Sequence, residues 1–222
     1  MIADALSKLR SALPAGVALV AVSKFHPVER LQEAYAAGQR IFAESRPQEL
    51  SAKVPQMSSD VQWHFIGHLQ TNKLKLVLPY VSLVQSVDSH HLLEAISAWG
   101  VANGRVVDVL LELHLGAEET KQGFTEEEIL SLCHSCHSER SEESFPGIRL
   151  RGIMGMASNT EDEAQIAAEF ARIEGLFHRI QSLGLPGFDQ LSIGMSGDWP
   201  IAVRHGATMV RIGTDLFGPR EY

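Results

Sequence analysis

Short apolar segments alternate with helix-like segments along this chain, and this alternation restricts the fold more than any other feature. Strands of nearly continuous apolar character, each followed by a helix, are typical of a parallel sheet that is buried on both faces. Eight such units predict an α/β fold, a closed (β/α)8 barrel of the TIM type, in a single domain over residues 1–222. The expected strands are residues 17–22, 40–44, 61–67, 81–88, 105–115, 148–156, 188–194 and 207–214.

A doubly wound open sheet is the competing architecture. No GxGxxG motif follows the first expected strand, which weakens a dinucleotide-binding version of that fold. We therefore favour the barrel.

Capping signals mark the starts of several expected helices. Asp88 or Ser89 suits an N-cap, and two pairs have the spacing of a capping box, Thr125 with Glu128 and Thr160 with Glu163. The expected helices are residues 28–38, 47–54, 69–80, 90–104, 125–135, 160–184 and 196–206.

One segment does not fit the alternation. Residues 134–147 are rich in Ser, Glu and His and have no apolar period, so we expect an exposed loop or an insertion. Cys133, Cys136 and His137 have the C-x-x-C-H spacing of c-type haem attachment. Because MIADALSKLR has none of the features of an export signal, we interpret both cysteines as reduced thiols instead.

Charge and hydropathy exclude several classes of partner. The net charge of −8 and a pI near 5.7 argue against a nucleic-acid surface, which needs clustered Lys and Arg. No run of eighteen apolar residues exists that could span a membrane. We expect a cytoplasmic protein that has a small-molecule or protein partner.

The stretch VALVAVSKFHP, residues 17–27, ends an apolar strand in a lysine. In a barrel, residues just past the strand ends lie at the C-terminal face, where binding and catalytic groups gather. Desolvation would lower the pKa of the Lys24 amine, and a neutral amine forms a Schiff base with an aldehyde. The alternative is a lysine that extends from the strand end into water.

The loops after the last two expected strands favour the first interpretation. LSIGMSGDW ends a strand with Gly194 and then offers Ser196, and RIGTDLFG offers Gly213 and Thr214 in the same manner. Loops after strands 7 and 8 commonly hold phosphate in such barrels, through backbone N–H groups and hydroxyls. A lysine after strand 1 together with these loops suggests a phosphorylated aldehyde as ligand.

Several motifs resemble the pyridoxal phosphate homeostasis protein family. They are AVSK at 21–24, WHFIGHLQTNK at 63–73, RGIMGMAS at 151–158, LSIGMSGD at 191–198 and MVRIGTDLFGPREY at 209–222. They occur in order over nearly the whole chain. The resemblance implies a barrel similar to the N-terminal domain of alanine racemase, with pyridoxal 5'-phosphate (PLP) as cofactor.

The resemblance also implies a role for individual residues. Lys24 matches the Schiff-base lysine, and Arg211 matches the arginine that faces the pyridine nitrogen. Ser196, Gly213 and Thr214 match the phosphate-binding residues. The strand-3 motif places two further residues close to the cofactor, His64 and Ile66.

The chain departs from the family pattern after the second expected strand. Many members have FGEN there, with the Asn near the 3'-oxygen of the cofactor, whereas this chain has FAES. Ser45 therefore stands at the Asn position and Ala43 replaces the Gly. Ser45 is the expected cofactor contact at this position, with a hydroxyl in place of the amide.

The resemblance implies control of free PLP, by buffering or by delivery to PLP-dependent apo-enzymes, with no assigned reaction. An arginine at the pyridine nitrogen cannot readily supply a proton, which weakens PLP as an electron sink. A PLP-dependent racemase-like enzyme of low activity is the alternative; we expect it to lack the second base that a separate domain gives racemases. A barrel enzyme that binds a sugar phosphate through a lysine imine is a third hypothesis.

Overall fold

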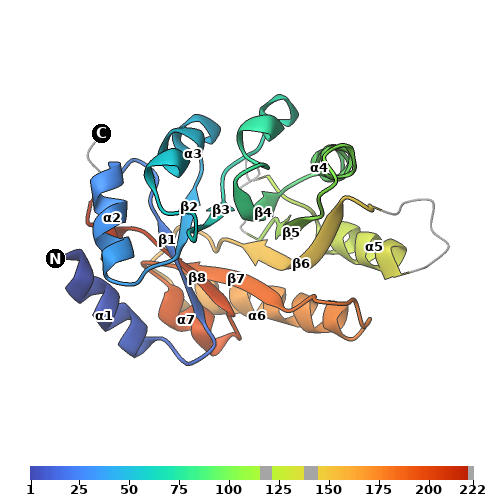
Figure 1. Ribbon diagram of the computed structural model, residues 1–222. Coiled ribbons are helices and arrows are strands. Elements are labelled where there is room, and N and C mark those ends of the chain that lie inside the picture. Colours follow the sequence, from blue (N-terminus) through green and yellow to red (C-terminus); the bar gives the residue numbers. More distant parts are fainter. Residues whose placement is uncertain (116–121, 138–144, 220–222) are drawn as a thin grey trace.

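The computed structural model describes residues 1–115, 122–137 and 145–219. Eight parallel strands are hydrogen-bonded in sequence order into a closed barrel, and β1 pairs with β8. The predicted (β/α)8 barrel is therefore confirmed (Figure 1). The strands are β1 Ala18–Val22, β2 Ile41–Glu44, β3 Gln62–Phe65, β4 Val81–Val87, β5 Val107–Leu113, β6 Ile148–Gly155, β7 Gln190–Met195 and β8 Met209–Ile212.

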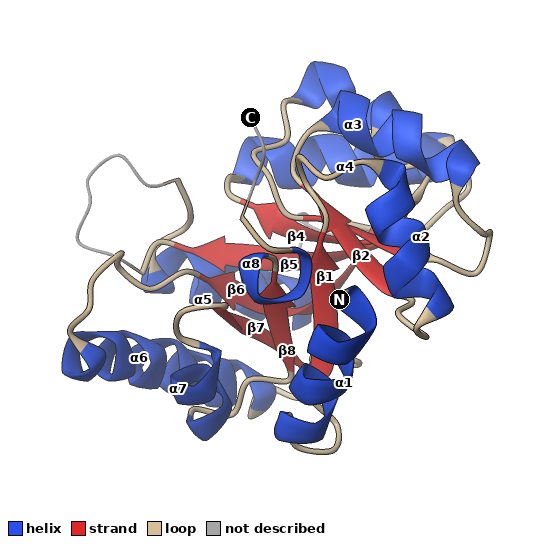
Figure 2. Ribbon diagram, turned by 90° about the vertical axis from the view of Figure 1, so that its left-hand side faces the viewer, coloured by secondary structure: helices blue, strands red, loops and turns tan. Residues whose placement is uncertain are grey.

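Helices surround the strands, as Figure 2 shows. The connection from β3 to β4 carries a 3-10 segment in the place where the other connections have an α-helix. The helices are α1 Ile2–Ala12, α2 Val28–Ala36, α3 Pro47–Lys53, α4 His90–Ala102, α5 Glu126–His137, α6 Glu163–Gln181, α7 Trp199–Arg204 and α8 Thr214–Phe217, with 3-10 turns η1 Val54–Gln56 and η2 Thr71–Leu76.

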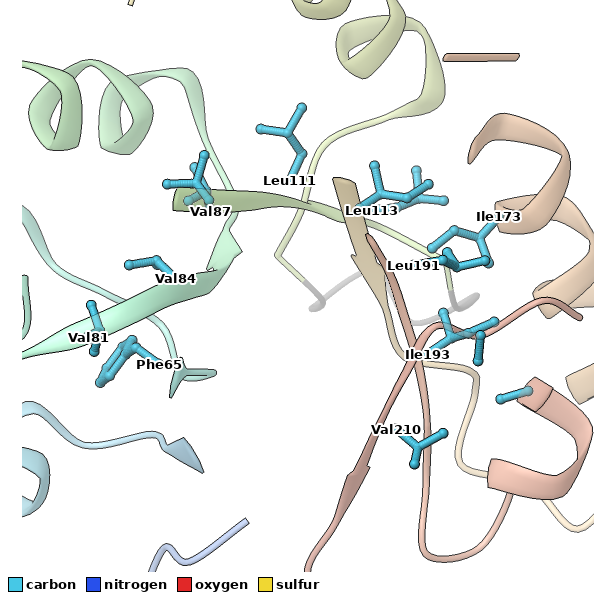
Figure 3. Close-up of a cluster of buried hydrophobic side chains, with 14 of the residues drawn as sticks. Phe65, Val81, Val84, Val87, Leu111, Leu113, Ile173, Leu191, Ile193 and Val210 are labelled. Carbon is cyan, nitrogen blue, oxygen red and sulfur yellow. The ribbon is translucent and has the colours of Figure 1, made fainter. Parts of the chain in front are cut away.

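Alternate residues of each strand face two different apolar cores, because successive side chains of a strand point to opposite faces. The larger core lies between the barrel and its helices; Figure 3 shows Leu191 and Ile193 of β7 beside Ile173 of α6. The smaller core fills the barrel interior. Its buried members are Val20, Val22, Ala43, Leu83, Leu110, Met154 and Met209.

Two of the predicted caps are confirmed. Ser89 caps α4, and its side chain accepts a hydrogen bond from the Leu92 N–H. Thr125 and Glu128 form a reciprocal capping box: the Thr125 N–H donates to Glu128 Oε2, and the Glu128 N–H donates to Thr125 Oγ1. Local side-chain chemistry decides these helix starts.

The capping box predicted at Thr160 is wrong. Helix α6 begins later, at Glu163, because the carboxylate of Asp162 caps it by accepting from the N–H groups of Ala164 and Gln165. Thr160 Oγ1 instead accepts from the Asp162 N–H in a local turn.

Two elements differ from the expected helices. Helix α1 was not expected; it buries Ile2, Leu6 and Leu9, which lie on one helical face. Residues 69–80 form a 3-10 helix over Thr71–Leu76 instead of an α-helix, with i to i+3 bonds such as Val77 N–H to Leu74 O.

The expected loop at residues 134–147 begins too early, because α5 extends to His137 and includes both cysteine positions. Cys133 is buried in the outer core. Residues 138–144 lie outside the described residues, so the insertion stays a prediction. Among the described residues, no helix is both long and apolar enough to cross a membrane.

Candidate functional site at the C-terminal mouth of the barrel

The strand register brings the predicted site residues to one end of the barrel. Ala21 of β1 pairs with Ile212 of β8, so Lys24 and Thr214 follow neighbouring strand ends. The carboxyl ends of parallel strands meet at one face, which is the mouth of the barrel. The predicted residues come from an arc of five adjacent strands, β7, β8, β1, β2 and β3.

Lys24 lies in a tight turn directly after β1. The His26 N–H donates to the Ser23 carbonyl over 3.1 Å, and this bond closes a β-turn around Lys24 and Phe25. Phe25 has φ of +67°, a left-handed conformation that a bulky residue rarely adopts. Lys24 itself is partly buried, neither deep in the core nor fully in solvent.

The loops after β7 and β8 are joined at the mouth. The Asp215 N–H donates to Ser196 Oγ over 3.3 Å. A Cβ built on Gly213 would lie 3.5 Å from the Val22 carbonyl oxygen of β1, so this loop runs close to the strand that leads to Lys24. The mouth therefore offers hydroxyl and backbone N–H groups beside the lysine turn.

Gly194 has a structural role in this loop pair. Its φ is +93°, and a Cβ built there would lie 2.6 Å from Ala202 Cβ of α7. Only glycine combines that backbone conformation with such a close approach of α7. The shape of this loop therefore requires glycine at position 194, and its contact with the cofactor stays a prediction.

Arg211 is buried in the barrel interior on β8. Its Nη1 donates to the Ser192 carbonyl and to Ser192 Oγ, both at 2.7 Å, and its Nη2 donates to the Gly155 carbonyl at 2.9 Å. Burial lowers the pKa of Arg211 to about 10, against the opposing attraction of Glu112 and Asp198. The guanidinium is therefore held in one position and remains a cation at neutral pH.

A chain of buried polar side chains connects Arg211 to His64. Ser192 Oγ donates to Gln85 Oε1 at 2.7 Å, and Gln85 Nε2 lies 2.8 Å from His64 Nδ1. Since the amide nitrogen donates, His64 Nδ1 accepts, and the imidazole carries its proton on Nε2. Burial lowers the pKa of His64 to about 3, so the ring is neutral.

Gln85 and Ser192 were not among the predicted site residues. Each lies on an inward-facing position of an apolar strand, and a polar residue within such a strand was the available signal. The partner of each residue comes from a different strand, which the sequence does not reveal.

Ser45 and Ile66 lie side by side at the ends of β2 and β3. Both are partly buried, and Ile66 packs against the inner core. The chain at Ser45 passes so close to Gly67 that a Cβ built on Gly67 would lie 2.2 Å from the Ser45 carbonyl oxygen. Backbone packing therefore fixes the position of Ser45 at the mouth.

A cavity of about 210 Å³ opens at the mouth on the side of β5. Glu112 lines it, and burial raises the pKa of this carboxyl to about 7, with a smaller contribution from Asp88 and opposing ones from Arg211 and His68. His68 Nδ1 lies 2.7 Å from Asp88 Oδ2 at its edge. The remaining lining residues are Ile66, Leu113, His114, Leu115, Gln122 and Met156.

Comparison with known proteins shows the family to which this chain is similar. The family model for the alanine racemase N-terminal domain matches residues 1–221. A pyridoxal phosphate homeostasis protein from Schizosaccharomyces pombe is 37% identical over 215 residues, which cover 95% of this chain and 87% of that protein.

Solved structures of similar sequence have the same fold. PipY of Synechococcus elongatus PCC7942 without PLP has a TM-score of 0.90 at 36% identity, covering 98% of this chain and all of PipY. Its structure with PLP bound has a TM-score of 0.87 at 35% identity, with the same coverage. From its sequence, its barrel and these relatives, the chain belongs to the pyridoxal phosphate homeostasis protein family, within the alanine racemase N-terminal domain fold.

Proposed function

We propose that this protein binds pyridoxal 5'-phosphate as a Schiff base on Lys24 and takes part in PLP homeostasis. The observation that carries the proposal is the pairing of β1 with β8. It brings the Lys24 turn next to Gly213 and Thr214, and the N–H of the following residue, Asp215, donates to Ser196 Oγ.

The groups at the mouth fit the three parts of this cofactor. The amine of Lys24 would hold the cofactor at its aldehyde carbon. Ser196 Oγ, Thr214 and the backbone of Gly213 would hold the phosphate. Arg211, fixed by three hydrogen bonds, would face the pyridine nitrogen and can only donate to it.

Three further residues would surround the ring on the side of β2 and β3. His64 is neutral and held by Gln85, so it offers a fixed donor at Nε2. Ile66 offers apolar contact, and Ser45 offers a hydroxyl. PLP supplies an electron sink when it is bound, and a donor-only arginine keeps that sink weak.

The proposal therefore favours buffering or delivery of PLP over turnover. Apo forms of PLP-dependent enzymes are the proposed recipients, and the cytoplasm is the proposed compartment. The names of the relatives support this reading, since they describe homeostasis and not a reaction.

A slow racemase-like activity is the second candidate, and the position of Glu112 favours it. This carboxyl lines the mouth cavity together with Ile66 and can hold or release a proton near neutral pH. Proton NMR of amino acids in deuterated water tests the candidate: exchange of the α-proton that is lost in Glu112→Gln would support it. No exchange by the PLP-loaded protein would exclude it.

The experiment for the main proposal is the visible absorbance spectrum of the protein with PLP, before and after borohydride. We expect a band that borohydride bleaches, and a reduced adduct that mass spectrometry of peptides assigns to Lys24. Lys24→Ala should form no adduct, while Lys75→Ala, which removes an exposed lysine on η2, should behave as wild type. A wild-type protein without a band, or an adduct on another lysine, would overturn the proposal.

A further inference from the structure

A buried charged cluster lies directly behind the lysine turn. Lys53, the last residue of α3, donates all three of its ammonium hydrogens: to Glu44 Oε1 at 2.8 Å, to Glu49 Oε1 at 2.7 Å and to the Ser23 carbonyl at 2.8 Å. We call Lys53, Glu44 and Glu49 the Lys53 cluster. Its side chains are 8%, 0% and 20% exposed, respectively, so water screens it little.

The cluster binds the backbone on both sides of Lys24. On one side, Lys53 holds the Ser23 carbonyl, and Ser23 Oγ donates to Glu44 Oε1 at 2.6 Å. On the other side, the Phe25 N–H donates to Glu49 Oε1 at 2.7 Å. Lys24 is therefore the one residue between two anchored neighbours.

The direction of the side chains separates the cluster from the mouth. Val20 and Val22 of β1 face the barrel interior, and Leu19 and Ala21 face the helices. Ser23 follows this alternation on the helix side, where its Oγ donates to Glu44 Oε1, so the cluster lies outside the barrel interior. The cluster can hold the turn without occupying the ligand site.

The turn needs such support because its conformation is strained. Phe25 occupies the third position of the turn with φ of +67°, where glycine or asparagine is usual. A residue in this region persists only where its surroundings hold it there, and such residues gather at functional sites. The guanidinium of Arg46 lies 4.4 Å from the centre of the Phe25 ring and covers it.

Stability alone is a poor reason for a cluster of this kind. Burying an ion pair costs desolvation that its attraction often fails to recover. In addition, Glu44 Oε2 is buried with no hydrogen-bond partner among the described residues. The hydrogen bonds to Ser23 and Phe25 instead connect the cluster to the turn.

We propose that Lys53, Glu44 and Glu49 are positioning residues for Lys24: they fix the strained Ser23–His26 turn so that the lysine amine enters the mouth in reacting geometry. This inference deepens the proposed function and rests on it. Without the cluster, Phe25 would relax to negative φ, and the Lys24 backbone would rotate.

The first test is Lys53→Met, which keeps the apolar stem and removes all three hydrogen bonds. We expect Schiff-base formation with PLP to slow by about 10- to 100-fold, since displacements of about 1 Å have effects of this size. Arg151→Met is the matched control, because Arg151 also joins two carboxylates but lies at the opposite end of the barrel. It should form the Schiff base at the wild-type rate.

Glu49 provides a second test that does not depend on the most buried groups. Glu49→Gln keeps an oxygen that can accept from the Phe25 N–H, whereas Glu49→Leu removes it. We expect Glu49→Gln to recover most of the wild-type rate and Glu49→Leu to resemble Lys53→Met. The unfolding midpoints of Glu49→Gln and Glu49→Leu are measured as well. If these midpoints are equal, a difference in Schiff-base rate between the two variants cannot come from overall stability.

Amide hydrogen exchange of the PLP-free protein gives a readout that is independent of the cofactor. Faster exchange at Phe25 and His26 in Glu49→Leu than in Glu49→Gln would support the inference. This holds even if the wild-type protein forms no Schiff base, because that result would overturn only the proposed function. Unchanged exchange and unchanged Schiff-base rates in folded Lys53→Met and Glu49→Leu would overturn the inference. Equal loss of rate in Arg151→Met would also overturn it.

Discussion

The two ends of the barrel each carry a cation between two carboxylates, but the surroundings of the two groups differ. At the mouth, Lys53 lies between Glu44 and Glu49 and is almost inaccessible to water. At the opposite end, Arg151 of β6 joins Asp108 at 3.1 Å and Asp189 at 3.0 Å, with side chains that are 21%, 21% and 61% exposed, respectively.

The contacts of the two groups differ as well. Besides its carboxylates, Arg151 Nε donates to the Gly187 carbonyl, so it joins the beginnings of β5, β6 and β7. The Lys53 cluster instead binds the two neighbours of a single residue, Lys24. The same charge pattern connects strands at one end, and we propose that it positions Lys24 at the other. This fits the general division of such barrels into a stabilising and a functional face.

The largest effect on the stabilising end should come from Gly152→Ala in β6. A Cβ built on Gly152 would lie 1.7 Å from the Gln190 carbonyl oxygen, and its φ of +157° is unfavourable for alanine. The added Cβ belongs to β6 and the Gln190 carbonyl oxygen to its paired strand β7, so one of the two strands must move. We expect a loss of about 3 kcal/mol or more in the free energy of unfolding. Urea denaturation measures it.

Gly175→Ala in α6 is the control for this prediction, because no atom from outside the local helix backbone lies within 4 Å of the added Cβ. Alanine is favoured over glycine in a helix by about 1 kcal/mol, so this variant should be equally or more stable than wild type. A Gly152→Ala protein of wild-type stability would show that the β6–β7 register adapts freely.

The next largest effect should come from two buried groups at the mouth, His64 and Glu112, whose titration makes the free energy of unfolding depend on pH. The pKa of His64 is lowered to about 3 in the folded state. Between pH values of about 3 and 6.5 the unfolded chain therefore binds more protons than the folded protein, and stability rises with pH. Glu112 has its pKa raised to about 7, so between about 4.5 and 7 the folded state binds more protons and stability falls as pH rises. Each slope is about 1.4 kcal/mol per pH unit at most, and the two oppose each other.

The variant Glu112→Gln removes only the second slope. Its free energy of unfolding, relative to wild type, should therefore increase as pH rises from about 5 to 7, by roughly 1 to 3 kcal/mol in total. Urea titrations at several pH values measure this difference, with Glu127→Gln on the exposed face of α5 as the matched charge control. A difference that is constant over the whole range would contradict the assigned burial of Glu112.

The smallest effect should come from Arg151→Met. Because its partners are partly exposed, we expect a loss of about 1 kcal/mol, which becomes smaller at high salt. Denaturation at low and at high ionic strength measures it. A loss as large as that of Gly152→Ala would contradict the expectation that water screens this partly exposed group.

The sequence predicted those parts of the structure that depend on local patterns. Apolar strands gave the barrel, and Thr125 and Ser89 marked helix starts, because a capping side chain acts on N–H groups two or three residues away. The error at Thr160 has the same origin: Asp162 is a competing cap two residues later. The sequence also predicted that Lys24 and the loops after β7 and β8 lie at the same face, since parallel strands bring their carboxyl ends together.

Tertiary structure alone decided which side chains surround these residues. The sequence contains Gln85, Ser192, Lys53 and Glu49, but nothing in their local patterns says that the first two connect His64 to Arg211 or that the others hold Ser23 and Phe25. Hydrogen bonds and burial of charge depend on distances between strands and helices that are far apart in the chain. Those distances exist only after the barrel has closed, because closure brings β8 against β1 and α3 behind the turn that carries Lys24.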